Sequence, residues 1–75
     1  MEQRLENMVG NWYGEIEDIY GELAKMGIDF DNATSEYIIA WYVDKEKDED
    51  VELMIRLGGT QNTIVIKSIE ETYRG

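Results

Sequence analysis

Apolar residues recur at three- and four-residue steps through the first third of the chain. The set comprises Leu5, Met8, Val9, Trp12, Ile16, Ile19, Tyr20, Leu23 and Met26. Because such steps place side chains on one face of an α-helix, they predict a long amphipathic helix over residues 2–26. Lys25, Gly27 and Ile28 fit a C-terminal cap in which the glycine is left-handed. The helix is therefore expected to end at residue 26 or 27.

The rest of the chain predicts strands. Residues 29–35 are rich in side chains that bond their own backbone, which is typical of a connecting loop. An aromatic and β-branched run at 36–43, an alternating run at 51–57 and a short apolar run at 63–67 each indicate a strand. The short connections between these runs predict an antiparallel meander.

The last residues permit two interpretations. Ser68 and Glu71 have the spacing of a capping box, which predicts a short helical turn over 69–73, with a frayed strand as the alternative. The predicted fold is a single α+β domain over residues 1–75. One long N-terminal amphipathic helix packs on a three-stranded antiparallel β-meander.

The first predicted strand is apolar on both of its alternating faces, and a single helix can cover only one of them. If the helix covers Ile39 and Trp41, the other face presents an apolar interface made by Ile38, Tyr42 and Met54. Cover by the C-terminal segment or by the loop that contains Phe30 is the alternative.

The charged and reactive residues of the chain exclude several classes of function. The chain has 17 acidic and 7 basic residues, a net charge of −10, and neither His nor Cys. Catalysis by a Ser or Cys with a His base is therefore excluded, as are disulfides. The acidic run at 44–52 does not match a calcium loop, because Glu49 stands where glycine is needed and Ile55 where a bidentate glutamate is needed. We expect a non-enzymatic protein without a metal or cofactor.

A strongly negative chain is repelled by nucleic acid and by anionic membranes, and no signal peptide or membrane span is evident, so a cytoplasmic protein is expected. Rows of carboxylates can imitate a run of phosphates. The sequence offers two such rows: Glu15, Asp18 and Glu22 on the helix, and Asp44, Glu46, Asp48, Glu49 and Asp50 in the first hairpin. These rows predict binding to a basic protein, such as a nucleic-acid-binding enzyme. The alternative is that the charge only provides solubility.

Three glycines, Gly10, Gly14 and Gly21, fall on the polar side of the predicted helix. Either a partner approaches the bare backbone there, or the helix is kinked or broken near Gly10 or Gly14.

In its order of elements the predicted layout resembles the double-stranded-RNA-binding domain, although the chain lacks the basic residues that such domains place on phosphates. It also resembles some small phage anti-CRISPR proteins, which implies an inhibitor that mimics nucleic-acid charge. The rival hypothesis is a structural or assembly module, either a homodimer or a subunit of a larger complex, held by apolar contacts.

Overall fold

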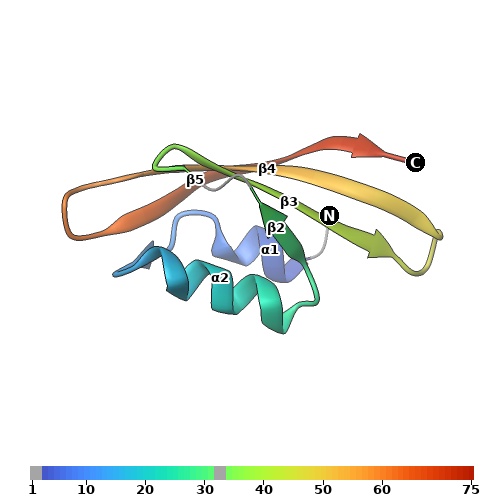
Figure 1. The fold of residues 1–75 in the computed structure, drawn as a ribbon, viewed down its shortest axis with the longest axis horizontal. Coiled ribbons are helices and arrows are strands. Elements are labelled where there is room, and N and C mark those ends of the chain that lie inside the picture. The colour runs from blue at the N-terminus through green and yellow to red at the C-terminus, as the bar shows by residue number, and fades with distance from the viewer. Residues whose placement is uncertain (1–2, 32–33) are drawn as a thin grey trace.

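A computed structural model describes residues 3–31 and 34–75. The elements in chain order are α1 (Gln3–Met8), β1 (Trp12–Tyr13), α2 (Ile16–Lys25), β2 (Asp29–Asp31), β3 (Tyr37–Asp44), β4 (Glu49–Gly59) and β5 (Ile64–Arg74). The described strands form one antiparallel, five-stranded sheet in the order β1-β5-β4-β3-β2. In Figure 1 both helices lie on the same side of this sheet. The molecule is therefore mostly sheet, and the prediction of a long helix on a three-stranded meander is wrong.

The predicted helix over 2–26 is interrupted around Gly10 and Gly14, whereas Gly21 lies within α2. Gly10 adopts a left-handed conformation with φ of +86°, and its N–H donates to the Ile66 carbonyl oxygen of β5 at 2.8 Å. The Asn11 side chain donates to the Asn7 carbonyl oxygen at 3.0 Å, which satisfies a free carbonyl at the end of α1. The chain then runs as strand β1 along β5 before α2 begins. The structure therefore confirms the second interpretation of the glycines, in which the helix is broken near Gly10 or Gly14.

The second helix has clear signals at both ends. Glu15 precedes it in an extended conformation, and the Glu15 N–H donates to the Asp18 carboxylate at 3.3 Å. At the other end Gly27 is left-handed with φ of +72°, and the Ile28 N–H donates to the Leu23 carbonyl oxygen at 3.0 Å. This is the glycine cap that the sequence predicts.

The predicted helical turn at 69–73 is also wrong, because these residues belong to β5. Two irregularities in the β4–β5 pairing hide the strand pattern. Leu57 pairs with Ile66 but Arg56 pairs with Ser68, so Lys67 is an extra residue in β5. A second shift, between Glu52 and Leu53, has the same effect further along. Because a bulge moves the next inward residue by one position, Ile66 and Ile69 acquire a spacing of three that imitates a helix.

The predicted loop over 29–35 contains strand β2, which pairs with β3 at Ile39 to Trp41. Phe30 points inward and stacks on Tyr20 of α2, with ring centroids 4.4 Å apart and an interplanar angle of 13°. Asp29 and Asp31, on either side of it, are exposed. The three residues thus follow the alternation of a half-buried strand, although two of the three are residue types that strands disfavour.

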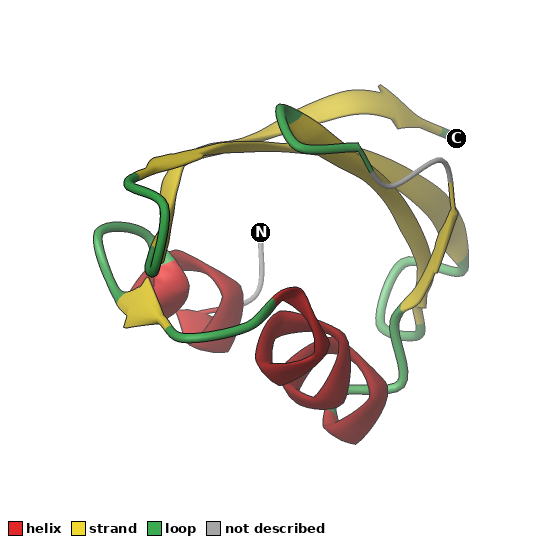
Figure 2. Ribbon diagram, turned by 60° about the vertical axis from the view of Figure 1, so that its left-hand side comes forward, coloured by secondary structure: helices red, strands yellow, loops and turns green. Residues whose placement is uncertain are grey.

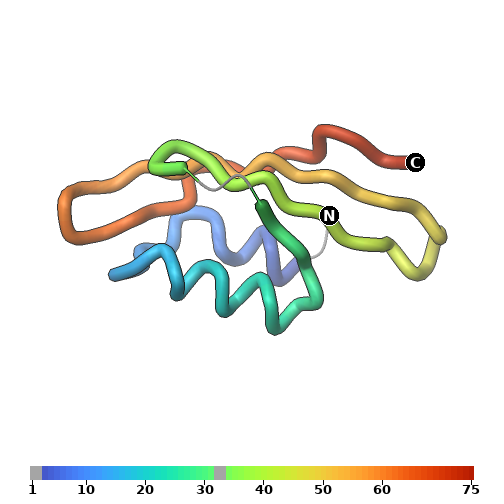
Figure 3. The backbone as a smooth tube through the Cα atoms, in the orientation of Figure 1, coloured from blue at the N-terminus to red at the C-terminus, as the bar shows by residue number. Residues whose placement is uncertain are grey.

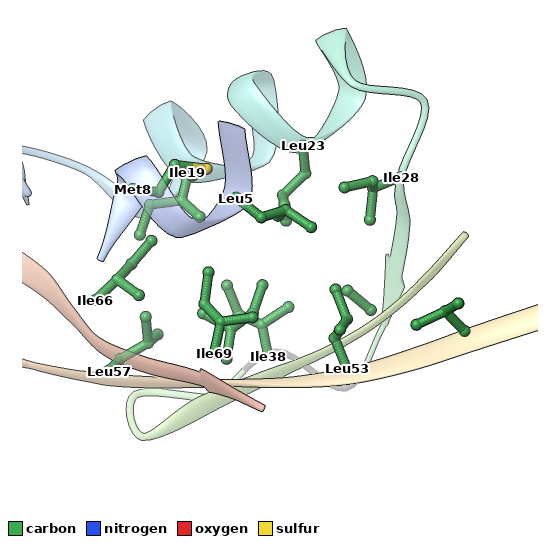
Figure 4. Packing of buried hydrophobic residues seen from close by; sticks show 13 residues of the cluster. Leu5, Met8, Ile19, Leu23, Ile28, Ile38, Leu53, Leu57, Ile66 and Ile69 are labelled. Atoms are coloured by element: carbon green, nitrogen blue, oxygen red, sulfur yellow. The ribbon is translucent and has the colours of Figure 1, made fainter. Parts of the chain in front are cut away.

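The core lies between the helices and the concave face of the sheet. Figure 2 shows the sheet curving over both helices, and Figure 4 shows the side chains that meet between them. Leu5, Ile19 and Leu23 from the helices and Ile38, Leu53, Ile55 and Ile66 from the sheet are fully buried. Burial of such side chains is the main stabilising term in a domain of this size.

The β3–β4 hairpin extends past the C-terminal end of α2, as Figures 1 and 3 show. The Gly75 backbone accompanies it, since Gly75 and Asp50 exchange two backbone hydrogen bonds of 2.8 and 3.0 Å. The hairpin and the end of β5 therefore form an arm of sheet that the described helices do not cover.

Candidate interaction surface

The sheet has a second face, which we call the outer face, turned away from both helices. Directly paired residues of neighbouring strands point to the same side of a sheet, so the register defines this face. Its members alternate with the buried core residues: Trp12 on β1, Asp29 and Asp31 on β2, Tyr37, Ile39, Trp41 and Val43 on β3, Asp50, Glu52, Met54 and Arg56 on β4, and Val65, Ser68, Glu70 and Tyr73 on β5. No described helix packs on the outer face.

Apolar side chains gather on this face along β3. We define the Trp41 patch as Ile39, Trp41 and Val43 of β3 with Met54 of β4, which pairs directly with Ile39. Trp41 retains 41% of its surface exposed and Val43 retains 52%. Exposed tryptophan and β-branched residues side by side are typical of surfaces that bind other proteins.

Carboxylates surround the Trp41 patch. Trp41 pairs with Asp29 on one neighbouring strand and with Glu52 on the other, and Val43 pairs with Asp50. We call Asp29, Asp50 and Glu52 the rim acids. Within residues 3–31 and 34–75, none of the three side chains forms an ion pair or a side-chain hydrogen bond. Their charges are therefore not compensated by those residues.

Acids on the opposite, inner face of the same arm are ion-paired. Arg74 of β5 contacts Asp44 at 2.9 Å, Glu49 at 3.5 Å and Glu71 at 2.6 Å, which ties β3, β4 and β5 together. These four side chains are between 22% and 31% exposed. A network of this kind, partly withdrawn from water, stabilises more than a single exposed pair.

The Arg74 network shifts the protonation of its members. Hydrogen bonds from the Arg74 guanidinium hold the pKa of Asp44 below its usual value, helped by the backbone N–H groups of Lys47 and Glu46. Arg74 lowers the pKa of Glu71 in the same way, and these carboxylates raise the pKa of Arg74. Burial raises the pKa of the nearby Tyr42 phenol, an effect that Arg74 opposes.

The predicted hairpin acids thus have different surroundings. Asp44 and Glu49 belong to the Arg74 network, and the Asp44 carboxylate also accepts the N–H of Glu46 at 3.1 Å to shape the turn. Glu46 and Asp48 are exposed at the tip, where Asp48 has a left-handed φ of 52°. Asp50 points to the outer face.

The predicted helix acids lie elsewhere. Asp18 receives the Glu15 N–H, and Glu22 forms an exposed ion pair with Lys25 at 3.4 Å. The N-terminal half of α2 faces the β4–β5 turn, since Ile16 and Tyr20 line a depression with Gly59 and Thr60. The C-terminal end of α2 approaches the β3–β4 hairpin instead. Glu15 and Asp18 are therefore remote from the hairpin acids along the molecule, and the two predicted rows do not form one surface.

The predicted apolar interface is divided between two faces. Ile38 is fully buried in the core, and Tyr42 lies on the same inner face, half-buried. Met54 alone of the three lies on the outer face. The condition on which that interface depends, a helix over Ile39 and Trp41, is not met, because these two residues point away from the helices.

Two members of the rim are not among the site residues predicted from the sequence. Glu52 stands in an alternating strand next to the apolar run, and Asp29 lies in the segment expected to be a loop. The signal for Asp29 was the alternation of Asp29, Phe30 and Asp31, which fits a short strand.

No protein-family model, curated protein or solved structure matches this chain. The resemblance to the RNA-binding domain and to anti-CRISPR proteins depends on a predicted layout of one helix and three strands. The observed order of elements is different, so that resemblance carries no further argument.

The described residues also bear on catalysis, metal binding and membrane crossing. An open depression of about 1130 Å³ lies by the arm and is lined in part by Met26, Tyr42, Asp44 and Arg74. A carboxyl that acts as a general acid needs a raised pKa, whereas that of Asp44 is lowered. Within the described ranges, no group of three or more acidic side chains is arranged to hold a metal ion, and no helix is long and apolar enough to cross a membrane.

Proposed function

We propose that this protein acts by recognition and binds a partner protein with a basic surface. The observation that carries the proposal is the contrast between the two faces of the arm. Three inner carboxylates are ion-paired with the single Arg74 guanidinium, whereas no described residue pairs with the rim acids, which lie beside exposed apolar side chains. With a net charge of −10, such a surface would attract a cationic partner over a distance of about 10 Å at 0.1 M salt.

The sharpest form of the proposal is an inhibitor or regulator of a nucleic-acid-binding protein. Surfaces that bind phosphates are rich in Lys and Arg, and an acidic protein can occupy them without touching nucleic acid. In that case duplex DNA or RNA should compete with this protein for the same partner.

The test is affinity chromatography of extract from the native host on the immobilised protein, eluted with a salt gradient. A specific partner should elute at raised salt, and the purified partner should then bind with an affinity that falls as salt is added. If the purified partner binds equally well across the gradient, the electrostatic proposal is wrong.

An assembly module is the second candidate, favoured by the exposed Trp41, Val43 and Trp12. A homodimer held by these apolar contacts should appear in sedimentation equilibrium at micromolar concentration and should persist or strengthen in high salt. A monomer under all salt conditions would exclude the homodimer.

A further inference from the structure

We infer that the docking site is the Trp41 patch with its rim acids, and that its occupant is a protein surface carrying Lys or Arg side chains around an apolar centre. This inference rests on the proposed function and specifies which part of the molecule performs it.

The Trp41 patch combines the two elements of a binding surface. Trp41 supplies a large, stiff apolar side chain of the type that dominates binding energy at interface centres. Asp29 and Glu52 lie directly across from it on the two neighbouring strands. A partner that covers Trp41 would therefore place its own side chains over both carboxylates.

The other acidic surfaces fit a partner less well. Asp44, Glu49 and Glu71 are already held by Arg74 at 2.6–3.5 Å, so a cationic partner would have to displace that guanidinium. On α2, Asp18 holds the helix start and Glu22 is paired with Lys25. These carboxylates have partners within the chain, whereas the described residues provide none for the rim acids.

The outer face is also asymmetric in charge. Away from the hairpin, Arg56 pairs with Glu70 at 3.9 Å. The Lys67 side chain lies over Gly58, where a Cβ atom would meet it. These basic residues are near the β4–β5 turn, and the rim acids are near the β3–β4 hairpin. The charge distribution thus assigns the cationic partner to the hairpin half of the face.

Charge complementarity disfavours a second copy as the occupant. A two-fold contact through the Trp41 patch would bring Asp29, Asp50 and Glu52 of both copies into one interface. Like charges brought together without compensation oppose association. A partner with basic residues around an apolar contact removes this repulsion and satisfies the same carboxylates.

The test uses the protein itself as the probe, with the photo-reactive residue p-benzoylphenylalanine at one of two positions. Position 43 is on the outer face and 52% exposed, and position 24 is exposed on α2. Each protein is irradiated in extract from the native host, and the attached protein is identified and purified. The inference predicts a strong cross-link from position 43 and a weak one from position 24.

The purified partner is then titrated against Trp41→Ala, Glu52→Lys and Glu22→Lys. The last two variants change the net charge equally but at different places, Glu52 on the outer face and Glu22 on α2. We expect Trp41→Ala and Glu52→Lys each to weaken binding by at least about tenfold, and Glu22→Lys to weaken it by less than about threefold. Circular dichroism of each variant verifies the fold.

Four results would overturn the inference. Equal weakening by Glu52→Lys and Glu22→Lys would mean that net charge alone matters, and the proposed function would survive. A cross-link from position 24 with unchanged affinity of Trp41→Ala would move the site to α2, again without loss of the proposed function. Cross-linking only between copies of this chain would replace the partner with a homodimer. Absence of any salt-sensitive partner would reject the inference and the proposed function together.

Discussion

At the scale of single residues, the same residue type has different roles on the two faces of the sheet. Asp44 is half-buried beside Arg74, and its pKa is lowered by that contact. Asp50, six positions later, points outward and pairs across the sheet with Val43. From sequence alone both belong to one acidic run. Only the pairing of β3, β4 and β5 shows that Arg74, 30 residues from Asp44, neutralises one and leaves the other.

The Arg74 network makes stability dependent on pH. The pKa values of Asp44 and Glu71 are lowered in the folded state, so the unfolded state binds more protons in acid. Their contribution is therefore complete above the usual carboxyl range and is lost as the pH falls through the lowered values. Arg74→Met should reduce the thermal midpoint by a few degrees at neutral pH and by progressively less in acid, measured by circular dichroism.

Lys25→Met is the control for Arg74→Met. It breaks an ion pair whose side chains are 75% and 46% exposed, and such pairs contribute little. The account is contradicted if Arg74→Met lowers the midpoint as much at about pH 2, where carboxyls are protonated, as at neutral pH.

Two glycines provide a matched pair of substitutions. Gly21 lies within α2, and Gly27 follows its cap with φ of +72°; a Cβ at either position meets nothing within 4 Å. Gly21→Ala should raise the free energy of unfolding by about 0.5–1 kcal/mol, because alanine is the better helix former. Gly27→Ala should lower it by about 1–2 kcal/mol, because a side chain disfavours the left-handed conformation. Urea denaturation measures both, and a loss at Gly21 would indicate a backbone constraint that the structure does not contain.

At the scale of elements, the sequence predicted best where the hydrophobic period was uninterrupted. The alternation of Val51, Leu53, Ile55 and Leu57 predicted β4, and the steps from Ile16 to Leu23 predicted α2. The helical steps also continued through Trp12, which is 61% exposed and lies in β1. An interruption of the helix can preserve the four-residue spacing of apolar residues while the backbone changes conformation. The signal in the sequence is the glycine at position 10, which adopts a left-handed conformation where the helix ends.

The prediction for the C-terminal segment was wrong because a true strand lacks the regular period of a strand. Its side chains do face the core, but the extra residue at Lys67 changes the two-residue period of Ile64 and Ile66 into the three-residue step to Ile69. A bulge is defined by the partner strand, so the sequence of β5 by itself could not distinguish it from a helical turn. The sequence of β3 by itself likewise could not show which face of the sheet carries Trp41, because that depends on which face the helices cover.

The two faces of the sheet should respond differently to truncation. Leu53 is fully buried on β4, so Leu53→Ala should cost about 2–5 kcal/mol through lost burial and a residual cavity. Val43, on the outer face of β3, is 52% exposed, and Val43→Ala should cost less than about 1 kcal/mol. Chemical denaturation of both variants checks the difference. Equal costs would mean that something covers the outer face.

At the scale of the whole molecule, the layers explain why so small a chain leaves an apolar surface open. The described helices are short, and both lie under the concave face of the sheet (Figure 2). Neither of them covers the outer face. Both tryptophans of the chain, Trp12 and Trp41, lie on that outer face. Large aromatic residues are usually buried when folding alone determines their position. Trp12 and Trp41 are instead 61% and 41% exposed.

The most direct test of the account is whether Trp41 is accessible within a local negative field. In Trp12→Phe, Trp41 is the remaining tryptophan, and its fluorescence reports on collisions with dissolved quenchers. At low ionic strength, and with each quencher compared with its effect on free tryptophanamide, caesium ions should quench Trp41 relatively more strongly than iodide, because the rim acids attract cations. Adding Asp29→Asn and Glu52→Gln should reduce that preference, whereas adding Glu15→Gln and Glu22→Gln, which removes the same charge from the region of α2, should largely preserve it. A Trp41 shielded from both quenchers, or a preference unchanged by neutralising the rim, would contradict the account.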